Sequence, residues 1–358
     1  MIISRPLPAM PRLLKMLAPD LAPIEIPRVN TLKDIRSYIA SRADALPVDT
    51  QEERDSLSAK IQAKSQACFL WVRLILDELE HVYGFRSIMD ILEGIPEGMI
   101  PYYQRATGLI HGKRETEKSI AKAILRLVIA AARPLHTPEL AEALELESRD
   151  LKLPGNVKTA IEGLCGHLVQ VNDNESIQLV HLTAREFLLS EDATEFQVIK
   201  SAAQERLAST CLALLSAPKH RPPAHPALLQ RKRPAPSALL DYAATYFGHH
   251  VYSSSSEGDK LLVALYTLLK TNVQSWIEHV ARKGDLHCLL KTARNLRGYL
   301  DRRVKYEAPI SMPVKVVGNW STDLTRLVTR FGNALVSLPT SIYFLIPPLA
   351  PTTSTIHT

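Results

Sequence analysis

The sequence predicts a mainly α protein, in which a helical domain, a winged helix and an irregular α-helical array follow a residual N-terminal strand. Three observations favour this class. Apolar residues recur at helical spacing through most of the chain. Only 14 glycines occur in 358 residues, which argues against an all-β protein. Between residues 115 and 190, three helical patterns precede two short strand-like runs, which is the order of a winged helix.

The first elements are a strand end and several helices. Met1–Ile3 form a short apolar run closed by Pro6, and a proline cannot donate to a sheet, so we expect the end of a buried strand. "LKDIRSYIASRA" and residues 51–64 predict helices, and "CFLWVRLILDELEHV" predicts a helix buried on most sides. "GIPEGMIPYY" has two glycines and two prolines and marks a break.

The winged-helix pattern follows. "EKSIAKAILRLVIAAARPL" predicts its first helix and "HTPELAEAL" its second, where Thr137 can cap and Pro138 suits the first helical position. "NVKTAIEGLCGHL" predicts the third helix. "VQV" and "IQLV" surround the turn residues "NDNES", which indicates a hairpin, and "HLTAREFLLS" predicts a fourth helix directly after it.

The C-terminal half continues with helices. "PKHRPPAHPALLQRKRPAP" is rich in proline and basic residues and predicts an exposed loop. Residues 236–305 predict helical pairs without a fixed repeat period. From Pro309 onward the rise in proline and threonine predicts a linker or disordered tail.

Charge and cysteine content limit the class of protein. The net charge is +6, but residues 1–200 hold 24 basic and 28 acidic residues, whereas residues 201–358 hold 19 and 9. An anionic partner would therefore bind the C-terminal part. The four cysteines are far apart and lie in apolar patterns, which predicts reduced thiols in a cytoplasmic protein. We expect neither a secretory signal nor a membrane span.

Familiar catalytic motifs do not fit. In "GLIHGKRE", three residues separate Gly108 from Gly112 and Arg114 follows Lys113, so a phosphate loop is excluded and a polar loop is expected. The sequence has no GxSxG elbow, HExxH motif or Cys/His metal spacing. His249–His250 lack nearby carboxylate or thiol ligands, so we assign no metal.

A winged helix raises the alternative of nucleic-acid binding. The third helix offers Lys158 against Glu162 and no Arg, Asn or Gln, which argues against base reading. The basic C-terminal half could instead bind nucleic acid electrostatically. Its basic candidates are "RKR" at 231–233, Arg294, Arg297, Arg302 and Arg303.

"QLVHLTAREFLL" resembles the histidine-bearing end of the winged helix in NACHT-type signal-transduction NTPases, particularly the fungal NOD-like receptors. "MIISRPLP", "KSQACFLWVRLILDEL", "LRLVIAAARPLHTPELAEAL" and "SWIEHVARKGDLHCLLKTARNLRGYLDRR" are similar to further segments of that family, in the same order. The resemblance implies that Arg5 is the sensor arginine at the terminal phosphate of ATP. It implies that His181 contacts the β-phosphate of ADP.

The sequence departs from the family pattern because the phosphate loop, the Mg²⁺-binding acidic strand and the WD repeats are missing from it. We therefore expect a middle piece of such a receptor, with vestigial Arg5 and His181, no metal and no cofactor of its own. The expected function is a non-catalytic regulatory and relay fragment. Its expected partners are proteins, a second copy or a full-length relative, without a membrane or nucleic acid.

The resemblance and the composition together divide the chain into five parts. These are a residual nucleotide-binding part (1–28), a helical domain (29–110), a winged helix (111–192), a second helical region with a basic proline-rich loop at 217–236 (193–306), and a linker or tail (307–358).

Overall fold

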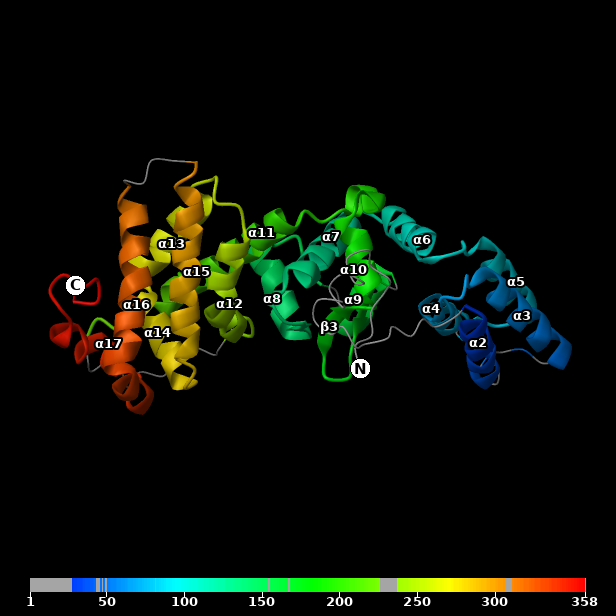
Figure 1. Ribbon diagram of the computed structural model, residues 1–358, viewed down its shortest axis with the longest axis horizontal. Helices are drawn as coiled ribbons and strands as arrows, with labels where there is room; N and C mark the ends of the chain where they lie inside the picture. Colours follow the sequence, from blue (N-terminus) through cyan, green and yellow to red (C-terminus); the bar gives the residue numbers. More distant parts are fainter. Residues whose placement is uncertain are drawn as a thin grey trace, which may run out of the picture. The chain divides into compact units, whose positions relative to one another are not determined.

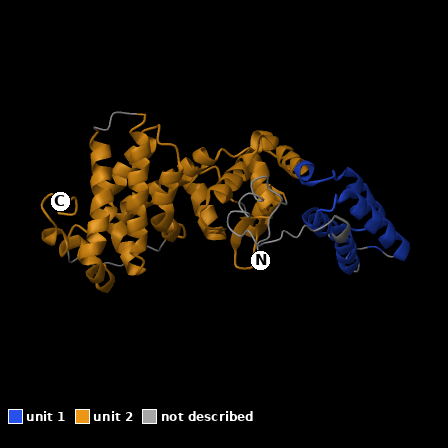
Figure 2. Cartoon of the chain, in the orientation of Figure 1, with its two compact units in different colours: residues 1–102 blue, residues 103–358 orange. Residues whose placement is uncertain are grey.

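The computed structural model describes residues 28–42, 46, 48, 50–80, 82–153, 155–166, 168–225, 237–306 and 311–357. The expected N-terminal strand, Arg5 and the "RKR" cluster at 231–233 lie outside these residues. Within them the protein is mainly α, as the sequence predicts (Figure 1). The chain divides into two compact units, residues 1–102 and 103–358 (Figure 2).

The first unit is built from helices. They are α2 (Arg28–Arg42), α3 (Gln51–Lys64), α4 (Phe69–Leu79), α5 (Phe85–Gly94) and the start of α6 (Met99–His111). α3 begins at Thr50, whose hydroxyl accepts from the Glu53 amide while the Glu53 carboxylate accepts from the Thr50 amide, a capping box. Trp71 of α4 is fully buried, and its indole N–H donates to the Pro96 carbonyl at 3.1 Å.

The end of α5 is closed by a lysine from α3. Lys64 Nζ donates to the carbonyls of Leu92 (2.8 Å), Glu93 (3.0 Å) and Ile95 (2.8 Å). Carbonyls at a helix C-terminus lack partners within the helix and attract a cation, so this contact fixes α5 against α3.

The second unit begins with the winged helix. Its helices and strands are α7 (Glu115–Ala130), β1 (Leu135–His136), α8 (Thr137–Glu147), α9 (Val157–Cys165), β2 (Val169–Val171), β3 (Ser176–Leu179) and α10 (Leu182–Leu189). The strands form an antiparallel sheet in the order β1-β3-β2, with Leu135 opposite Ile177 and Val169 opposite Leu179. The three helices, the hairpin and the fourth helix agree with the sequence prediction.

Three local details of this region differ from the sequence prediction. Strand β1 is too short to show an alternating pattern and exists because β3 pairs with it. His136, not Thr137, is the N-cap of α8, so Pro138 is the second helical residue. The expected polar loop at Gly108 is helical, because α6 runs to His111 and buries Ile110.

A helical array follows the winged helix, after a 3₁₀ turn (Glu191–Phe196). Its helices are α11 (Lys200–Leu215), α12 (Leu240–Ser253), α13 (Lys260–Thr271), α14 (Val273–Arg282), α15 (His287–Arg303), α16 (Met312–Ser337) and α17 (Ser341–Phe344). Shorter 3₁₀ turns cover Pro218–His220 and Pro347–Leu349. α11 packs on α7, α8, α12 and α13, and α15 packs between α12 and α16 (Figure 1).

The expected linker or tail is instead largely helical. Pro313 lies in the first turn of α16, where proline is tolerated, and Ser311 caps the helix by accepting from the Val314 amide. The final residues pack against this helix. Asp323 Oδ2 accepts from Ser354 Oγ (3.0 Å), the Thr355 amide (2.8 Å) and Thr355 Oγ1 (2.8 Å), and Ile356 is buried.

The winged helix and the array share one buried hydrogen-bond network. Tyr242 Oη accepts from the Ala132 amide (2.9 Å) and donates to His250 Nε2 (2.9 Å). His250 Nδ1 donates to Gln204 Oε1 (2.6 Å), and Gln204 Nε2 donates to the Ala130 carbonyl (2.8 Å). The side chains of this network all have hydrogen-bond partners. α7, α11 and α12 are therefore joined by polar contacts as well as by apolar packing.

No helix in the described ranges is both long enough and apolar enough to cross a bilayer.

Candidate functional site

His181 lies where β3 leads into α10, and it is the N-cap residue of that helix. Its backbone is extended, and its ring Nδ1 accepts from the Thr183 amide at 3.2 Å. Because a backbone N–H points at Nδ1, the proton of the neutral ring is on Nε2. The imidazole is exposed, so it presents an N–H donor to solvent at the positive end of a helix dipole.

A hydrogen-bond chain holds this ring in place. Thr183 Oγ1 lies 2.9 Å from His181 Nδ1 and also 2.9 Å from Tyr103 Oη, which comes from α6. Tyr103 is buried, and its ring packs against Phe187 with centroids 5.4 Å apart. The direction that satisfies all three groups is Tyr103 O–H to Thr183 Oγ1 and Thr183 O–H to His181 Nδ1. Buried side chains of α6 and α10 thus orient the exposed ring of His181.

His181 borders an open cleft of about 330 Å³ between the end of α7, β3 and the start of α10, called here the winged-helix cleft. Arg185 lies one helical turn after His181 and donates to the Ile129 carbonyl at 2.8 Å. Arg133 also lines the cleft and contacts Glu139 through two hydrogen bonds of 2.8 and 2.6 Å. The Glu139 carboxylate raises the pKa of the Arg133 guanidinium above its usual range.

The lining of the winged-helix cleft offers several groups that can bind an anion. His181, Arg133 and Arg185 provide N–H donors, and none of its described lining residues is a carboxylate. Glu139 offsets the charge of Arg133, whereas Arg185 donates to a neutral carbonyl. This arrangement can accept an anion or an acidic side chain at the N-terminus of α10.

The family resemblance pointed to His181, whose role stays a prediction, but the sequence analysis did not single out Arg185, Arg133, Thr183 or Tyr103. Arg185 could have been found from its spacing, since residues four apart share a helix face. Tyr103 and Arg133 come from other elements, so only the tertiary fold brings them to His181. Arg5 lies outside the described residues, and its relation to His181 stays a prediction.

The side chains considered for nucleic-acid binding have internal partners in several cases. Arg303 is 4% exposed and donates to the carbonyls of Ser256 (3.1 Å) and Gly258 (2.9 Å). The Arg302 guanidinium contacts the backbone carbonyl of Tyr252. It also lies over the aromatic ring of Tyr252, 4.5 Å from the ring centroid. In the third helix of the winged helix, Glu162 accepts from the Val171 amide at 3.2 Å.

Three of the cysteines and His250 lie in the core. Cys165, Cys211 and Cys288 are buried free thiols, and burial raises the pKa of Cys288 to about 11. His250 belongs to the buried network with Tyr242 and Gln204. Within the described part of the chain, no group of three or more His, Cys, Asp or Glu residues could hold a metal ion.

Comparison with known protein families finds a match in the middle of the chain. Residues 110–200 match the family of the GPI inositol-deacylase winged helix domain. No curated protein and no solved structure matches this chain. The matched residues include α7, the sheet, α8, α9 and α10, and therefore His181. The chain contains a winged helix domain that is similar to that of GPI inositol-deacylase.

Proposed function

We propose that this chain is a regulatory and relay part of a NACHT-type signal-transduction NTPase of the fungal NOD-like kind, acting through contacts with other proteins and not by catalysis. The match of residues 110–200 to a winged helix domain supports the central part of the proposal. The ordered resemblance of the flanking segments to the fungal receptors supports the rest.

The presentation of His181 is the observation on which the proposal depends. Its Nδ1 is occupied by Thr183, so its Nε2–H is available at the mouth of the winged-helix cleft. In the proposed role this N–H donates to a phosphate of a nucleotide held by a separate nucleotide-binding domain. The amides at the start of α10 add to the attraction, because a helix N-terminus favours anions.

This contact would make the winged helix sensitive to the bound nucleotide. A nucleotide that offers its phosphate to His181 favours the docked arrangement, and one that does not offer it favours release. The equilibrium between the docked and the released winged helix can shift only as far as the nucleotide's affinities for these two states differ. A released winged helix exposes the cleft and the side chain of Leu182, which is 59% exposed.

The test uses the nucleotide-binding domain of a fungal NACHT protein, made as a separate chain and loaded with fluorescent ADP. Adding the 358-residue chain should slow ADP release. His181→Ser should abolish this effect, because serine retains a good N-cap but carries no side-chain N–H donor. His287→Ala, at an exposed histidine of α15, is the matched control and should behave as the unchanged chain.

Two results would contradict the proposal. The first is an unchanged ADP release rate with the unaltered chain. The second is micromolar ATP binding or ATP turnover by the chain alone, because it would make the chain itself the NTPase.

A further inference from the structure

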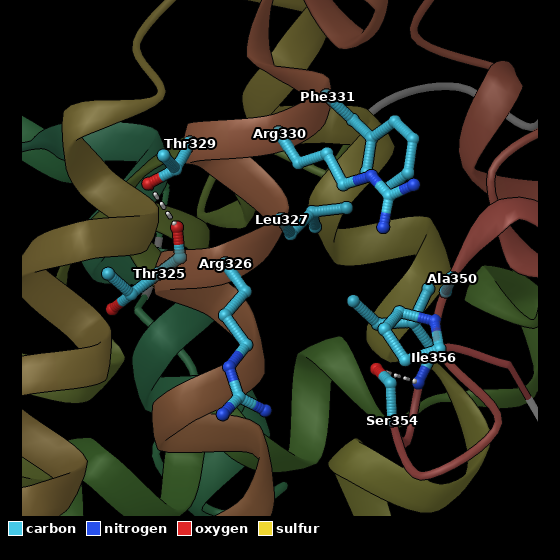
Figure 3. Close-up of a pocket in the computed structure, with 10 residues that line it drawn as sticks. Thr325, Arg326, Leu327, Thr329, Arg330, Phe331, Ala350, Ser354 and Ile356 are labelled. Carbon is cyan, nitrogen blue, oxygen red and sulfur yellow. Dashed lines mark hydrogen bonds between the residues drawn. The ribbon is translucent and has the colours of Figure 1, made fainter.

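The second unit holds another concave site, called here the α16 pocket, between α16 and the C-terminal loop (Figure 3). It encloses about 340 Å³. It lies in the helical array, and the residues that line it are separate from those of the winged-helix cleft. The inference below therefore does not depend on the proposed function.

The walls of the α16 pocket are mainly apolar. Leu327 and Phe331 lie four residues apart on α16 and so share one face of the helix. Ala350 and Ile356 of the C-terminal loop face them (Figure 3), and Pro351 of the same loop also lines the pocket. Leu327 is 1% exposed, so it forms the floor, whereas Phe331 is half-buried.

Two arginines stand on the rim. Arg326 and Arg330 are also four residues apart on α16, and both are exposed. Figure 3 shows both guanidinium groups extending beside the opening. Arg330 lies 5.2 Å from the centroid of the Phe331 ring. None of the described lining residues is acidic.

Asp323 decides the net charge and the rigidity of the site. Its Oδ1 lies 3.4 Å from Arg326 Nη1, a long contact, while its Oδ2 accepts from Ser354 and Thr355. One buried carboxylate against two guanidiniums leaves about one positive charge at the rim. Because the same carboxylate holds the loop on α16, both walls are fixed before any ligand arrives.

We propose that the α16 pocket binds an aliphatic anion, a short hydrocarbon chain that ends in one carboxylate or phosphate group. The hydrocarbon lies against Leu327, Phe331 and Ile356, and the anion accepts from Arg330 and Arg326. At about 30 Å³ per water-sized group, the pocket holds on the order of ten such groups. Guanidinium groups bind carboxylate and phosphate oxygens with matching geometry, which accounts for the charged end.

Isothermal titration of the full chain with decanoate and with decyl phosphate tests this inference. We expect one saturable site for at least one of them, and the tighter ligand identifies the headgroup. 1-Decanol, which lacks the charge, should bind about tenfold more weakly, as expected for loss of one charge-assisted hydrogen bond. Decyltrimethylammonium should bind more weakly still.

Arg330→Gln is the main variant, because Arg330 is exposed and its loss should leave the fold intact. It should weaken decanoate binding about tenfold. Arg294→Gln, an exposed arginine of α15, is the matched control and should change nothing. Ala350→Leu adds bulk to the wall of the pocket and should also weaken binding, provided that its thermal unfolding matches that of the unchanged chain.

Three outcomes would overturn the inference. They are no saturable binding of either anion, equal affinity for decyltrimethylammonium, and an unchanged affinity in Arg330→Gln.

Discussion

His250 donates from Nδ1 to Gln204 Oε1 across 2.6 Å, inside the core where α11 meets α12. His250→Ala would remove that donor and the acceptor of the Tyr242 hydroxyl, leaving the buried Gln204 Oε1 without its donor and the Tyr242 O–H without its acceptor. We expect a loss of about 3 kcal/mol in the free energy of unfolding, measured by urea denaturation. His249→Ala, at the half-buried neighbouring residue, should cost less than about 1 kcal/mol. Equal effects of the two substitutions would contradict the structural role of the network.

The same histidine should make stability depend on pH. Burial lowers the pKa of His250 from 6.5 to about 3. Between these values the unfolded state binds a proton that the folded state excludes, so stability falls as pH is lowered through this range. Between pH 7 and pH 5 this residue should remove about 2 kcal/mol. The free energy of unfolding of the unchanged chain and of His250→Ala should be measured at both pH values. The difference between the two proteins should be smaller at pH 5 than at pH 7 by that amount. A constant difference would show that His250 titrates normally.

Lys60 and Lys64 lie one turn apart on α3 and should differ in importance. Lys64 contacts three carbonyls at the end of α5, whereas Lys60 pairs with the exposed carboxylate of Glu93 at 2.5 Å. Lys64→Met should destabilise α5 by about 1–2 kcal/mol, and Lys60→Met by less than about 1 kcal/mol. Hydrogen exchange of the α5 amides in the full chain measures both. Faster exchange in the Lys60 variant than in the Lys64 variant would be the opposite of this prediction.

Thr194 has a strained backbone. Its φ is +50° and its ψ is −118°, which is unfavourable for a β-branched residue. The next residue is held in place, since Glu195 accepts from Lys122 at 3.0 Å and also contacts His111, and these contacts lower the pKa of Glu195. Thr194→Gly should relieve about 1–3 kcal/mol of strain against an entropy loss of about 0.5–1 kcal/mol.

The net effect of Thr194→Gly is a stabilisation of about 1 kcal/mol, visible as a higher midpoint of thermal unfolding. Thr194→Ala is the control, because alanine keeps its Cβ and so retains much of the strain. A lower midpoint for the glycine variant would mean that the Thr194 conformation is not strained.

Local sequence patterns predicted the helices well. The long apolar faces of α4 and α7 are determined by neighbours in the sequence. They therefore appear without knowledge of the fold. The place of His181 between a strand and a helix is also local and agrees with the expected hairpin and fourth helix, whereas its role, which the resemblance implies, stays a prediction.

Features that depend on distant residues were not predicted. β1 has two residues and requires the register with Ile177 of β3. The sequence around Pro313 suggests a linker, but proline in the first turn of α16 does not interrupt a helix. Arg303 suggests a basic surface in the sequence, yet the loop at Ser256 and Gly258 surrounds it. Tyr103 reaches Thr183 across 80 positions in the sequence, so the support of His181 could not be read from the chain alone.

The network through Tyr242, His250 and Gln204 has a consequence for how the second unit denatures. Hydrogen bonds of this kind cannot be exchanged for water while the surrounding core is closed. Melting of α12 would therefore strip partners from Ala132 at the end of α7, and melting of α7 would do the same in α12. Residues 103–358 should thus come apart in a single calorimetric transition, as one foldon that includes both the winged helix and the neighbouring helices.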